Sequence, residues 1–345
     1  MEYKNFKLPK WSIYLERFHF YLMQLVSLGI VVGLVLGSYL FFNPINPIVV
    51  PKVDTLTYEQ SLGKFDTEIS KRDNDQVNEV CKSKLLNHNQ KTEKVIVLFH
   101  GFTNCPAQFS QLSQKLFDLG YNVYIPRIPH HGLKDTLSED LENLSSLELV
   151  DFTAESVQVA TGLGNKITLF GLSGGGVLAS FGGYFYSQVQ NIYICAPLFA
   201  PHGFDGWQLP FVINLLSVLP SEFTWWDSKT KEKVESPSYA YPRFNSKAAL
   251  AFITLSYQLK NALEKHALPQ NGKRLALLTV ENDQAINNSF ARSMIENWMS
   301  DPDTALIAYQ FSASKVQLHD FVDPNQKKQN IEYTYPVILE LVQKI

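Results

Sequence analysis

The sequence predicts an α/β fold: a mostly parallel sheet with helices on both faces and an inserted cap, preceded by one transmembrane helix. Three observations predict it. Short apolar runs alternate with amphipathic segments, one long interval interrupts this alternation, and one uncharged apolar run lies near the N-terminus. With 45% hydrophobic and 18% charged residues, the 345-residue chain can build a sizeable core, which excludes disorder as its main state. Its net charge of −3 argues against a nucleic-acid binder with a basic face.

The apolar run from Phe18 to Phe42 contains no Asp, Glu, Lys or Arg. It exceeds the roughly 20 residues that a helix needs to cross a bilayer core. Lys4, Lys7 and Lys10 precede it, so we expect a signal anchor with a cytoplasmic N-terminus and the rest of the chain across the membrane. A cleaved signal peptide and a buried or interfacial helix are the alternatives. The absence of a small-residue cleavage site after the run favours the anchor.

Three glycines, Gly29, Gly33 and Gly37, recur every four residues within this run and share one helical face. Small residues at this spacing let two membrane helices approach closely, so one hypothesis is a homodimer formed through that face. The alternative is that glycine is simply common in membrane helices.

The remaining organisation follows from changes in composition along the chain. We expect a cytoplasmic tail over residues 1–17, the transmembrane anchor over 18–42, and a linker over 43–78 that is first proline-rich and then polar. Residues 79–345 are expected to form one α/β domain, with the cap at about 197–245.

Apolar, β-branched runs predict the strands of the sheet, and segments with helical spacing lie between them. The predicted strands are Lys94–His100, Tyr121–Pro126, Lys166–Phe170, Asn191–Ala196, Arg274–Glu281 and Ala305–Phe311. The predicted helices include Gln108–Leu119, Leu147–Leu163, Asn288–Met299 and Ile331–Lys344.

The interval between Ala196 and Arg274 is longer than one helix requires. Its first half is rich in proline and aromatic residues, among them Trp207, Trp225 and Trp226. Long insertions at the functional edge of a scaffold often form lids, so we expect this part to cover the sheet as a cap.

A Gly-Leu-Ser-Gly-Gly sequence at Gly171–Gly175 follows the strand Lys166–Phe170 directly and matches G-x-S-x-G. A serine on a sharp strand-to-helix turn has a strained backbone, and glycine on either side avoids steric clash. The free N–H groups at the start of the helix can face a developing negative charge. We therefore expect Ser173 to be a nucleophile, the alternative being a plain glycine-rich turn.

A nucleophilic serine needs a base and an acid that orients the base. Among the downstream histidines, His202 falls in the cap and His266 precedes the strand that should carry the acid. His319, which follows the last predicted strand, is therefore the expected base. Asp283 lies just beyond the strand Arg274–Glu281 and is the expected acid, with Glu281 as the alternative.

The negative charge of a tetrahedral intermediate needs two N–H donors. We expect them to be the backbone amides of Phe102, after the strand Lys94–His100, and of Gly174, after the nucleophile. His100 is expected to shape this turn rather than to take part in the reaction. The loop at His130–Gly132 is expected to be an ordinary loop, although it could also line the mouth of the site.

From about Glu79 onward the chain resembles the α/β-hydrolase superfamily, and most of all its carboxylesterase and monoacylglycerol-lipase branch. The resemblance rests on Leu98–Thr103, Gly171–Gly176, Asp283 and His319-Asp320, in this order along the chain. It implies the α/β-hydrolase fold and a Ser-Asp-His triad. Many triacylglycerol lipases have His at the position of Leu172. The form with Leu at this position is more typical of small esterases.

The expected function is that of a membrane-anchored serine hydrolase that cleaves carboxylic esters, or lipids with an ester bond, through an acyl-enzyme on Ser173. The aromatic cap predicts a medium or long acyl chain. A thioesterase, an acyltransferase, and a catalytically silent binding module at the membrane are the alternatives.

No cofactor is expected, and no metal, because the three cysteines lack the paired spacing of a zinc site. Cys81 and Cys105 lie on neighbouring elements and either form a disulfide or remain free thiols.

Overall fold

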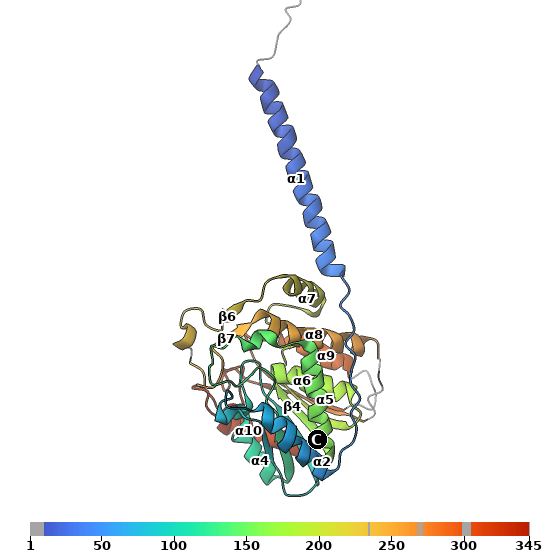
Figure 1. Cartoon of the computed structure of the whole chain (residues 1–345), viewed down its shortest axis with the longest axis vertical. Helices are drawn as coiled ribbons and strands as arrows, with labels where there is room; N and C mark the ends of the chain where they lie inside the picture. The colour runs from blue at the N-terminus through green and yellow to red at the C-terminus, as the bar shows by residue number, and fades with distance from the viewer. Residues whose placement is uncertain (1–9, 234, 267, 269–271, 299–304, 345) are drawn as a thin grey trace, which may run out of the picture.

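The computed structural model describes residues 10–233, 235–266, 268, 272–298 and 305–344. Residues 1–9 of the predicted cytoplasmic tail, with Lys4 and Lys7, lie outside the described residues, as does Met299 at the end of a predicted helix. In Figure 1 a long N-terminal helix stands on an α/β body, and the cap lies at the end of the body that this helix meets.

The centre of the body is a seven-stranded sheet in the order β1-β3-β2-β4-β5-β8-β9. Its strands are β1 (Lys84–Leu86), β2 (Thr92–Phe99), β3 (Tyr121–Ile125), β4 (Gly164–Leu172), β5 (Val189–Cys195), β8 (Arg274–Val280) and β9 (Ala305–Phe311). The edge strand β1 pairs antiparallel with β3, and the other neighbours pair parallel. The predicted mostly parallel sheet is confirmed.

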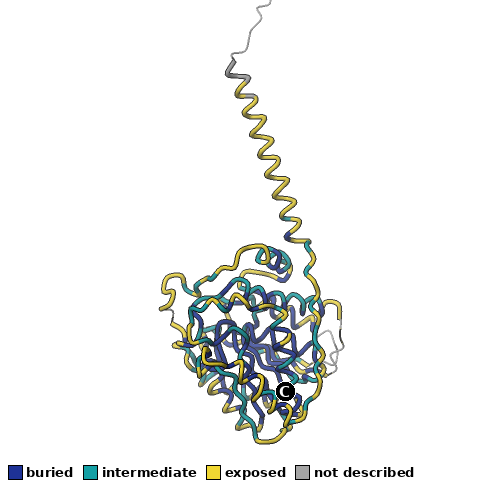
Figure 2. The backbone as a smooth tube through the Cα atoms, in the orientation of Figure 1, coloured by how far each residue is buried: buried dark blue, intermediate teal, exposed yellow. Residues whose placement is uncertain are grey.

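The two faces of the sheet carry separate hydrophobic cores because successive side chains of a strand point to opposite faces. On β2, Val95, Val97 and Phe99 join the core that also contains buried side chains of α5, α6, α8 and α9. Ile96 and Leu98 join the core shared with α4 and α10. Figure 2 shows the buried chain concentrated between these layers. Full burial of one such side chain stabilises the fold by about 1.5–3 kcal/mol.

The helices follow the expected alternation with small changes at their ends. The helices that cover the sheet are α4 (Leu112–Asp118), α5 (Ser146–Leu163), α6 (Gly174–Phe185), α8 (Ser246–Glu264), α9 (Asn288–Trp298) and α10 (Ile331–Lys344). Short helical turns occur at Glu79–Cys81, Pro106–Phe109, Asp140–Asn143, Gly206–Gln208 and Lys231–Lys233. The expected helix Gln108–Leu119 is in fact divided, since the turn that begins at Pro106 ends before α4 starts.

The segment 43–78, expected to be a linker, is helical over much of its second half. It contains α2 (Tyr58–Lys64), a π-helical turn (Phe65–Ile69) and α3 (Ser70–Arg72). The Ser61 hydroxyl donates to the Val159 carbonyl of α5, and Ile69 is buried in the core. These helices were not predicted because the segment is mostly polar and has few apolar residues. This part of the expected linker packs against the body.

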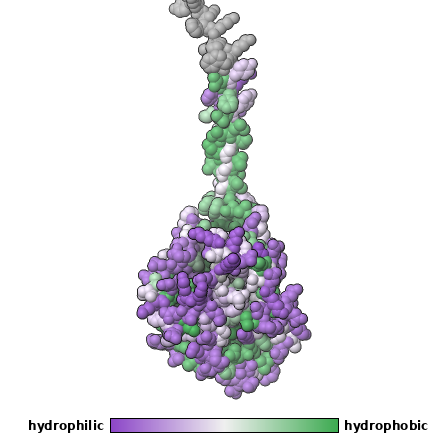
Figure 3. Space-filling view, turned by 90° about the vertical axis from the view of Figure 1, so that its left-hand side faces the viewer, coloured by the Kyte–Doolittle hydropathy of each residue, from purple (hydrophilic) through white to green (hydrophobic). Residues whose placement is uncertain are grey.

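The N-terminal helix α1 (Lys10–Phe42) contains a stretch, Arg17–Phe42, that is long and apolar enough to cross a membrane. Its side chains are mostly exposed and form the hydrophobic column in Figure 3. By length and composition this helix fits either an anchor or a signal sequence. The cap contains α7 (Leu209–Val218) and a small hairpin of β6 (Phe223–Trp225) and β7 (Arg243–Asn245).

Candidate active site

Ser173 lies between the end of β4 and the start of α6, in a strained backbone conformation. Its φ of 57° and ψ of −115° are unusual for a residue with a side chain and cost about 1–3 kcal/mol. Two hydrogen bonds hold the turn: the Ser173 amide donates to Cys195 O at 2.9 Å, and the Leu198 amide donates to Ser173 O at 3.0 Å. A Cβ on Gly175 would clash with the Phe99 carbonyl, so the tight turn requires glycine there.

His319 and Asp283 meet near this turn. Asp283 follows β8 and its side chain is fully buried, whereas His319 lies in the loop between β9 and α10. His319 Nδ1 lies 2.7 Å from Asp283 Oδ2. The other carboxylate oxygen accepts the amides of Ala285 and Ile286. Burial alone would raise the pKa of the Asp283 carboxyl, but His319 and these two amides lower it below its ordinary value, so the group is a carboxylate at neutral pH.

The opposite ring nitrogen, His319 Nε2, is buried and has no hydrogen-bond partner among the described residues. His319 and Ser173 both line one cavity, and of the described histidines only His319 does so. The alternative acid, Glu281, instead accepts a hydrogen bond from the Ala313 amide at 3.0 Å. An imidazole whose Nδ1 is held by a carboxylate has the tautomer in which Nε2 can accept a proton.

The two amides expected to stabilise negative charge come together beside Ser173. The Phe102 nitrogen lies 3.2 Å from the position that a Cβ on Gly174 would take. Gly174 is the first residue of α6, so its N–H has no partner within the helix. The two nitrogens therefore lie close together, on the turns that follow β2 and β4.

A buried amide, Gln108, joins the loop after β2 to the loop of His319. Gln108 Oε1 accepts the Gly101 amide, and Gln108 Nε2 donates to Asp320 Oδ2, both at 2.8 Å. Gln108 is only 1% exposed. This residue was not predictable from the sequence, because a single glutamine in a turn has no characteristic spacing. Its partner Asp320 contacts Gln108 and Asn104 through its carboxylate.

A second buried carboxylate, Asp323, ties the same loop to the cap. The Tyr239 hydroxyl donates to Asp323 at 2.8 Å, and Asn104 also donates to it. Burial, together with the nearby Asp320 carboxylate, raises the pKa of Asp323 to about 6. The hydroxyl and amide donors satisfy its oxygens in the charged form.

The cavity above Ser173 has a volume of about 350 Å³. Its apolar lining includes Leu198, Trp226, Phe244 and Ile253. Trp226 packs against Phe244 at 4.4 Å between ring centroids, and its indole N–H donates to Thr103 Oγ1 at 3.0 Å. A cavity lined largely by apolar side chains with a few polar groups is typical of a site for small molecules.

His100 is buried and shapes the turn after β2, as expected. Its Nδ1 bonds to Gly101 O and its Nε2 accepts the Ile128 amide at 3.0 Å. Burial, with His131 nearby, holds the pKa of His100 well below its usual range, so the ring is neutral. Neither His130 nor His131 lines the cavity.

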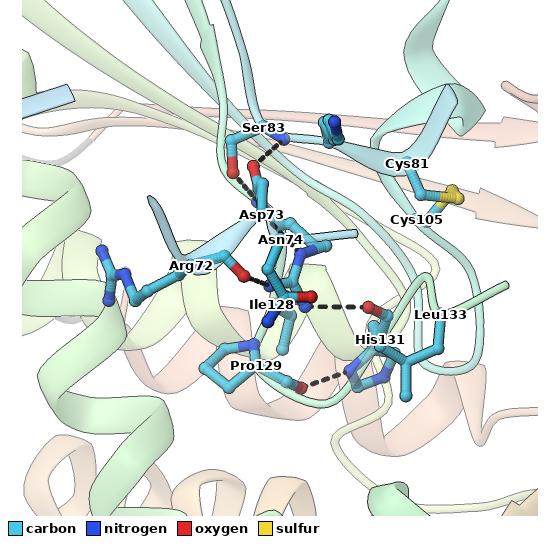
Figure 4. A network of polar contacts seen from close by, with 12 residues as sticks. Arg72, Asp73, Asn74, Cys81, Ser83, Cys105, Ile128, Pro129, His131 and Leu133 are labelled. Carbon is cyan, nitrogen blue, oxygen red and sulfur yellow. Dashed lines mark hydrogen bonds and ion pairs between the residues drawn. A yellow bond between two sulfur atoms is a disulfide. The ribbon is translucent and has the colours of Figure 1, made fainter. Parts of the chain in front are cut away.

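Beneath this turn, a disulfide between Cys81 and Cys105 joins the start of the body to the loop after β2 (Figure 4). The nearby Asp73 carboxylate accepts from the Ser83 amide and forms a buried ion pair with Arg127 at 2.6 Å. Cys195 is buried and free. In the described part of the chain, no group of three or more His, Cys, Asp or Glu side chains is arranged to hold a metal ion.

Comparison with known proteins gives one family and many similar folds. The model of a family described as the alpha/beta hydrolase family matches residues 96–319. A search of curated proteins finds no match.

Three solved structures share the fold. A monoglyceride lipase from Saccharomyces cerevisiae, in complex with a substrate analogue, has a TM-score of 0.58 at 12% identity, covering 76% of this chain and 90% of that chain. A structure from work on LipS and LipT, two metagenome-derived lipolytic enzymes, has a TM-score of 0.55 at 16% identity, covering 78% and 100%. The monoacylglycerol lipase of Paleococcus ferrophilus has a TM-score of 0.53 at 17% identity, covering 75% and 97%.

Proposed function

The chain belongs to the α/β hydrolase family, and from this premise we propose that it hydrolyses carboxylic esters through an acyl-enzyme on Ser173. The observation that carries the proposal is the hydrogen bond between Asp283 and His319. His319 lines the same cavity as Ser173, whose backbone is strained. A nucleophile, a base and an oriented carboxylate on separate loops of one scaffold constitute the machinery of acyl transfer.

In the proposed reaction, His319 Nε2 takes the proton of the Ser173 hydroxyl as its oxygen attacks the ester carbonyl. The amides of Phe102 and Gly174 stabilise the oxyanion of the tetrahedral intermediate. His319 then gives the proton to the leaving alcohol. Water, deprotonated by His319, attacks the acyl-enzyme and releases the acid with Ser173 restored. Asp283 keeps the imidazole oriented and stabilises its protonated form.

The proposed substrates are esters of medium or long acyl chains, including monoacylglycerols. The apolar wall formed by Trp226, Phe244 and Ile253 supports an acyl chain in the cavity. The similarity in fold to a monoglyceride lipase agrees with this class of substrate but does not by itself select it. We further propose that α1 is an uncleaved anchor with a cytoplasmic N-terminus, which would hold the body at the lipid surface.

The test is active-site labelling followed by a substrate series. A fluorophosphonate probe is expected to label the full chain and not the Ser173→Ala variant. The matched control Ser180→Ala, in the same helix α6, should still be labelled. The p-nitrophenyl esters from acetyl to palmitoyl should then be cleaved with a preference for acyl chains of eight or more carbons.

Other outcomes would change the assignment. If the folded protein is not labelled, the assignment as an enzyme is wrong and a catalytically silent binding module is favoured. Labelling with cleavage of acyl thioesters but not of oxygen esters would favour a thioesterase, and product formation only with an added alcohol would favour an acyltransferase.

A further inference from the structure

The last turn of α1 packs against the cap helix α7. The Phe41 ring stacks on Phe211 at 4.9 Å between centroids and on Trp207 at 6.3 Å. Leu40 is buried, unlike most of the exposed apolar residues that precede it in α1. Figure 1 shows α7 at the top of the body beside the lower end of α1. The cap and the apolar N-terminal helix are therefore in direct contact.

A polar bridge, Asn214, reinforces this contact. Its side-chain amide donates to the carbonyls of Leu40 and Asn43, both at 3.0 Å, and its oxygen accepts from the Asn43 side chain at 3.4 Å. Asn214 is only 5% exposed. The Leu40 carbonyl belongs to the last turn of a helix, where carbonyls lack helical partners. Asn214 thus satisfies the end of α1 and fixes it to α7.

Four large apolar side chains in the segment that contains α7 remain exposed, and we refer to them as the cap surface. They are Phe204 (40% exposed), Trp207 (66%), Val218 (61%) and Leu219 (45%). Apolar residues lie around the base of the α1 column, where it meets the body, in Figure 3. Indole rings in particular favour the boundary between lipid and water.

We infer that the cap surface contacts the lipid surface around α1, held there by the Asn214 bridge. The inference rests on the proposed anchoring through α1. The apolar part of α1 continues to Phe42, so Phe41 lies at the hydrocarbon boundary, and α7 touches Phe41 directly. The cap surface is therefore held at the same depth in the bilayer as Phe41. It continues the apolar surface of α1 that lies in the membrane. Insertion of its side chains removes apolar area from water.

The test measures the depth of fluorophores at single introduced cysteines. Cys81 and Cys105 are disulfide-bonded and Cys195 is buried, so a thiol-reactive fluorophore reports the introduced position. The variants are Trp207→Cys and Leu219→Cys. Leu119→Cys is the control, because Leu119 is similarly exposed at 39% and follows α4 at the opposite end of the body. The full chain is reconstituted in phosphatidylcholine vesicles with a fraction of lipid spin-labelled near the headgroup.

We expect the spin-labelled lipid to quench positions 207 and 219 at least threefold more than position 119. Equal quenching at positions 219 and 119 would overturn the inference, as would failure of the intact chain to float with the vesicles. Weak quenching at several chains per vesicle that rises at one chain per vesicle would show that a second copy covers the surface, and would also overturn it.

The Asn214 bridge is tested with Asn214→Asp, which keeps the shape but removes both donated hydrogen bonds. Quenching at position 219 should fall by half or more, and amide exchange over residues 43–50 should accelerate. Asn165→Asp adds the same charge at an exposed site at the start of β4 and should change neither. Unchanged quenching in Asn214→Asp would overturn the role of the bridge.

These measurements need no ester turnover. An active enzyme without quenching overturns only this inference, and a quenched but inactive chain overturns only the proposed function.

Discussion

The floor of the cavity consists of the turns that follow β2, β4, β8 and β9, whereas its roof consists of cap residues such as Trp226, Tyr241 and Phe244. Backbone geometry fixes the floor: Ser173 is held by three main-chain hydrogen bonds at the end of a buried strand. The roof is connected to the floor through single contacts, among them the Tyr241 amide to Thr103 O at 2.8 Å and the Trp226 indole to Thr103 Oγ1.

This difference indicates separate roles for the floor and the roof. A rigid floor can hold reacting groups to the fraction of an ångström that catalysis needs. A roof held by a few separate hydrogen bonds can change its shape without disturbing these groups. We therefore expect substitutions in the floor to lower kcat for every ester, and substitutions in the roof to alter KM and the preference for acyl length.

The largest effect is expected for Asp283→Asn in the floor. The amide keeps the shape but no longer selects the required tautomer of His319, so kcat should fall by about 10⁴-fold for short and long esters alike. Steady-state kinetics on purified protein measure it. Glu281→Gln, which alters the neighbouring carboxylate that contacts Ala313, should retain kcat within about threefold of the original chain. Equal losses in the two variants would contradict the assignment of the acid.

Gln108→Ala should lower kcat by about 10- to 100-fold, because the Gly101 amide loses its acceptor and the Phe102 amide loses its fixed position. KM should change little, which distinguishes positioning from loss of substrate contacts. A phosphonate transition-state analogue should bind more weakly by a similar factor. Gln114→Ala, in the exposed surface of α4, is the control. A rise in KM with unchanged kcat would contradict the role of Gln108 in positioning the Phe102 amide.

In the roof, Trp226→Ala should raise KM by about three- to tenfold for long acyl esters and leave acetyl esters nearly unchanged. The reason is that the indole contributes apolar wall but contacts no reacting group in the proposed mechanism. The exposed Trp207 does not line the cavity, and Trp207→Ala should leave both values unchanged in detergent. A loss of kcat for acetyl esters in Trp226→Ala would contradict the expectation that roof residues affect only KM and the preference for acyl length.

The smallest effect concerns the loop that supports the roof. Tyr241 donates to the His130 carbonyl, and the His130 ring lies between Glu148 and Asp140. The hydrogen bond to Glu148 raises the pKa of His130, although burial opposes this, and Asp140 adds to the increase. The protonated form therefore stabilises the fold below the unfolded pKa of about 6.5, and this contribution is lost as pH rises through the higher folded pKa.

Urea unfolding of the original chain and of His130→Asn tests this. Asparagine tolerates the left-handed backbone that His130 adopts at φ 63°. The stability of the original chain relative to His130→Asn should be greatest at pH 5.5 and should fall as the pH rises through the raised pKa of His130. A difference that grows with pH would show that His130 is neutral in the folded protein.

The sequence predicted the floor more fully than the roof. G-x-S-x-G predicted the turn at Ser173 because only a few residue types tolerate so tight a backbone, and the apolar runs predicted the strands that carry it. The partner of Gly101 was not predictable, since Gln108 reaches it through a fold-specific contact. The helices from Tyr58 onward were not predicted, because the few apolar residues of α2 and the π-helical turn are recognisable only where they pack against α5. The bounds of the linker stay a prediction. Whether the cap begins and ends at about 197–245 stays a prediction.

The disulfide between Cys81 and Cys105 closes a loop of 24 residues, all of which precede Ser173 in the chain. Closing so short a loop costs less chain entropy than joining distant segments. If the residues after α1 cross the membrane in the order of their synthesis, both thiols emerge before the nucleophile does. The loop that carries the Phe102 amide can then be covalently closed while the rest of the sheet is still being synthesised, so the order of synthesis favours a preformed half of the site.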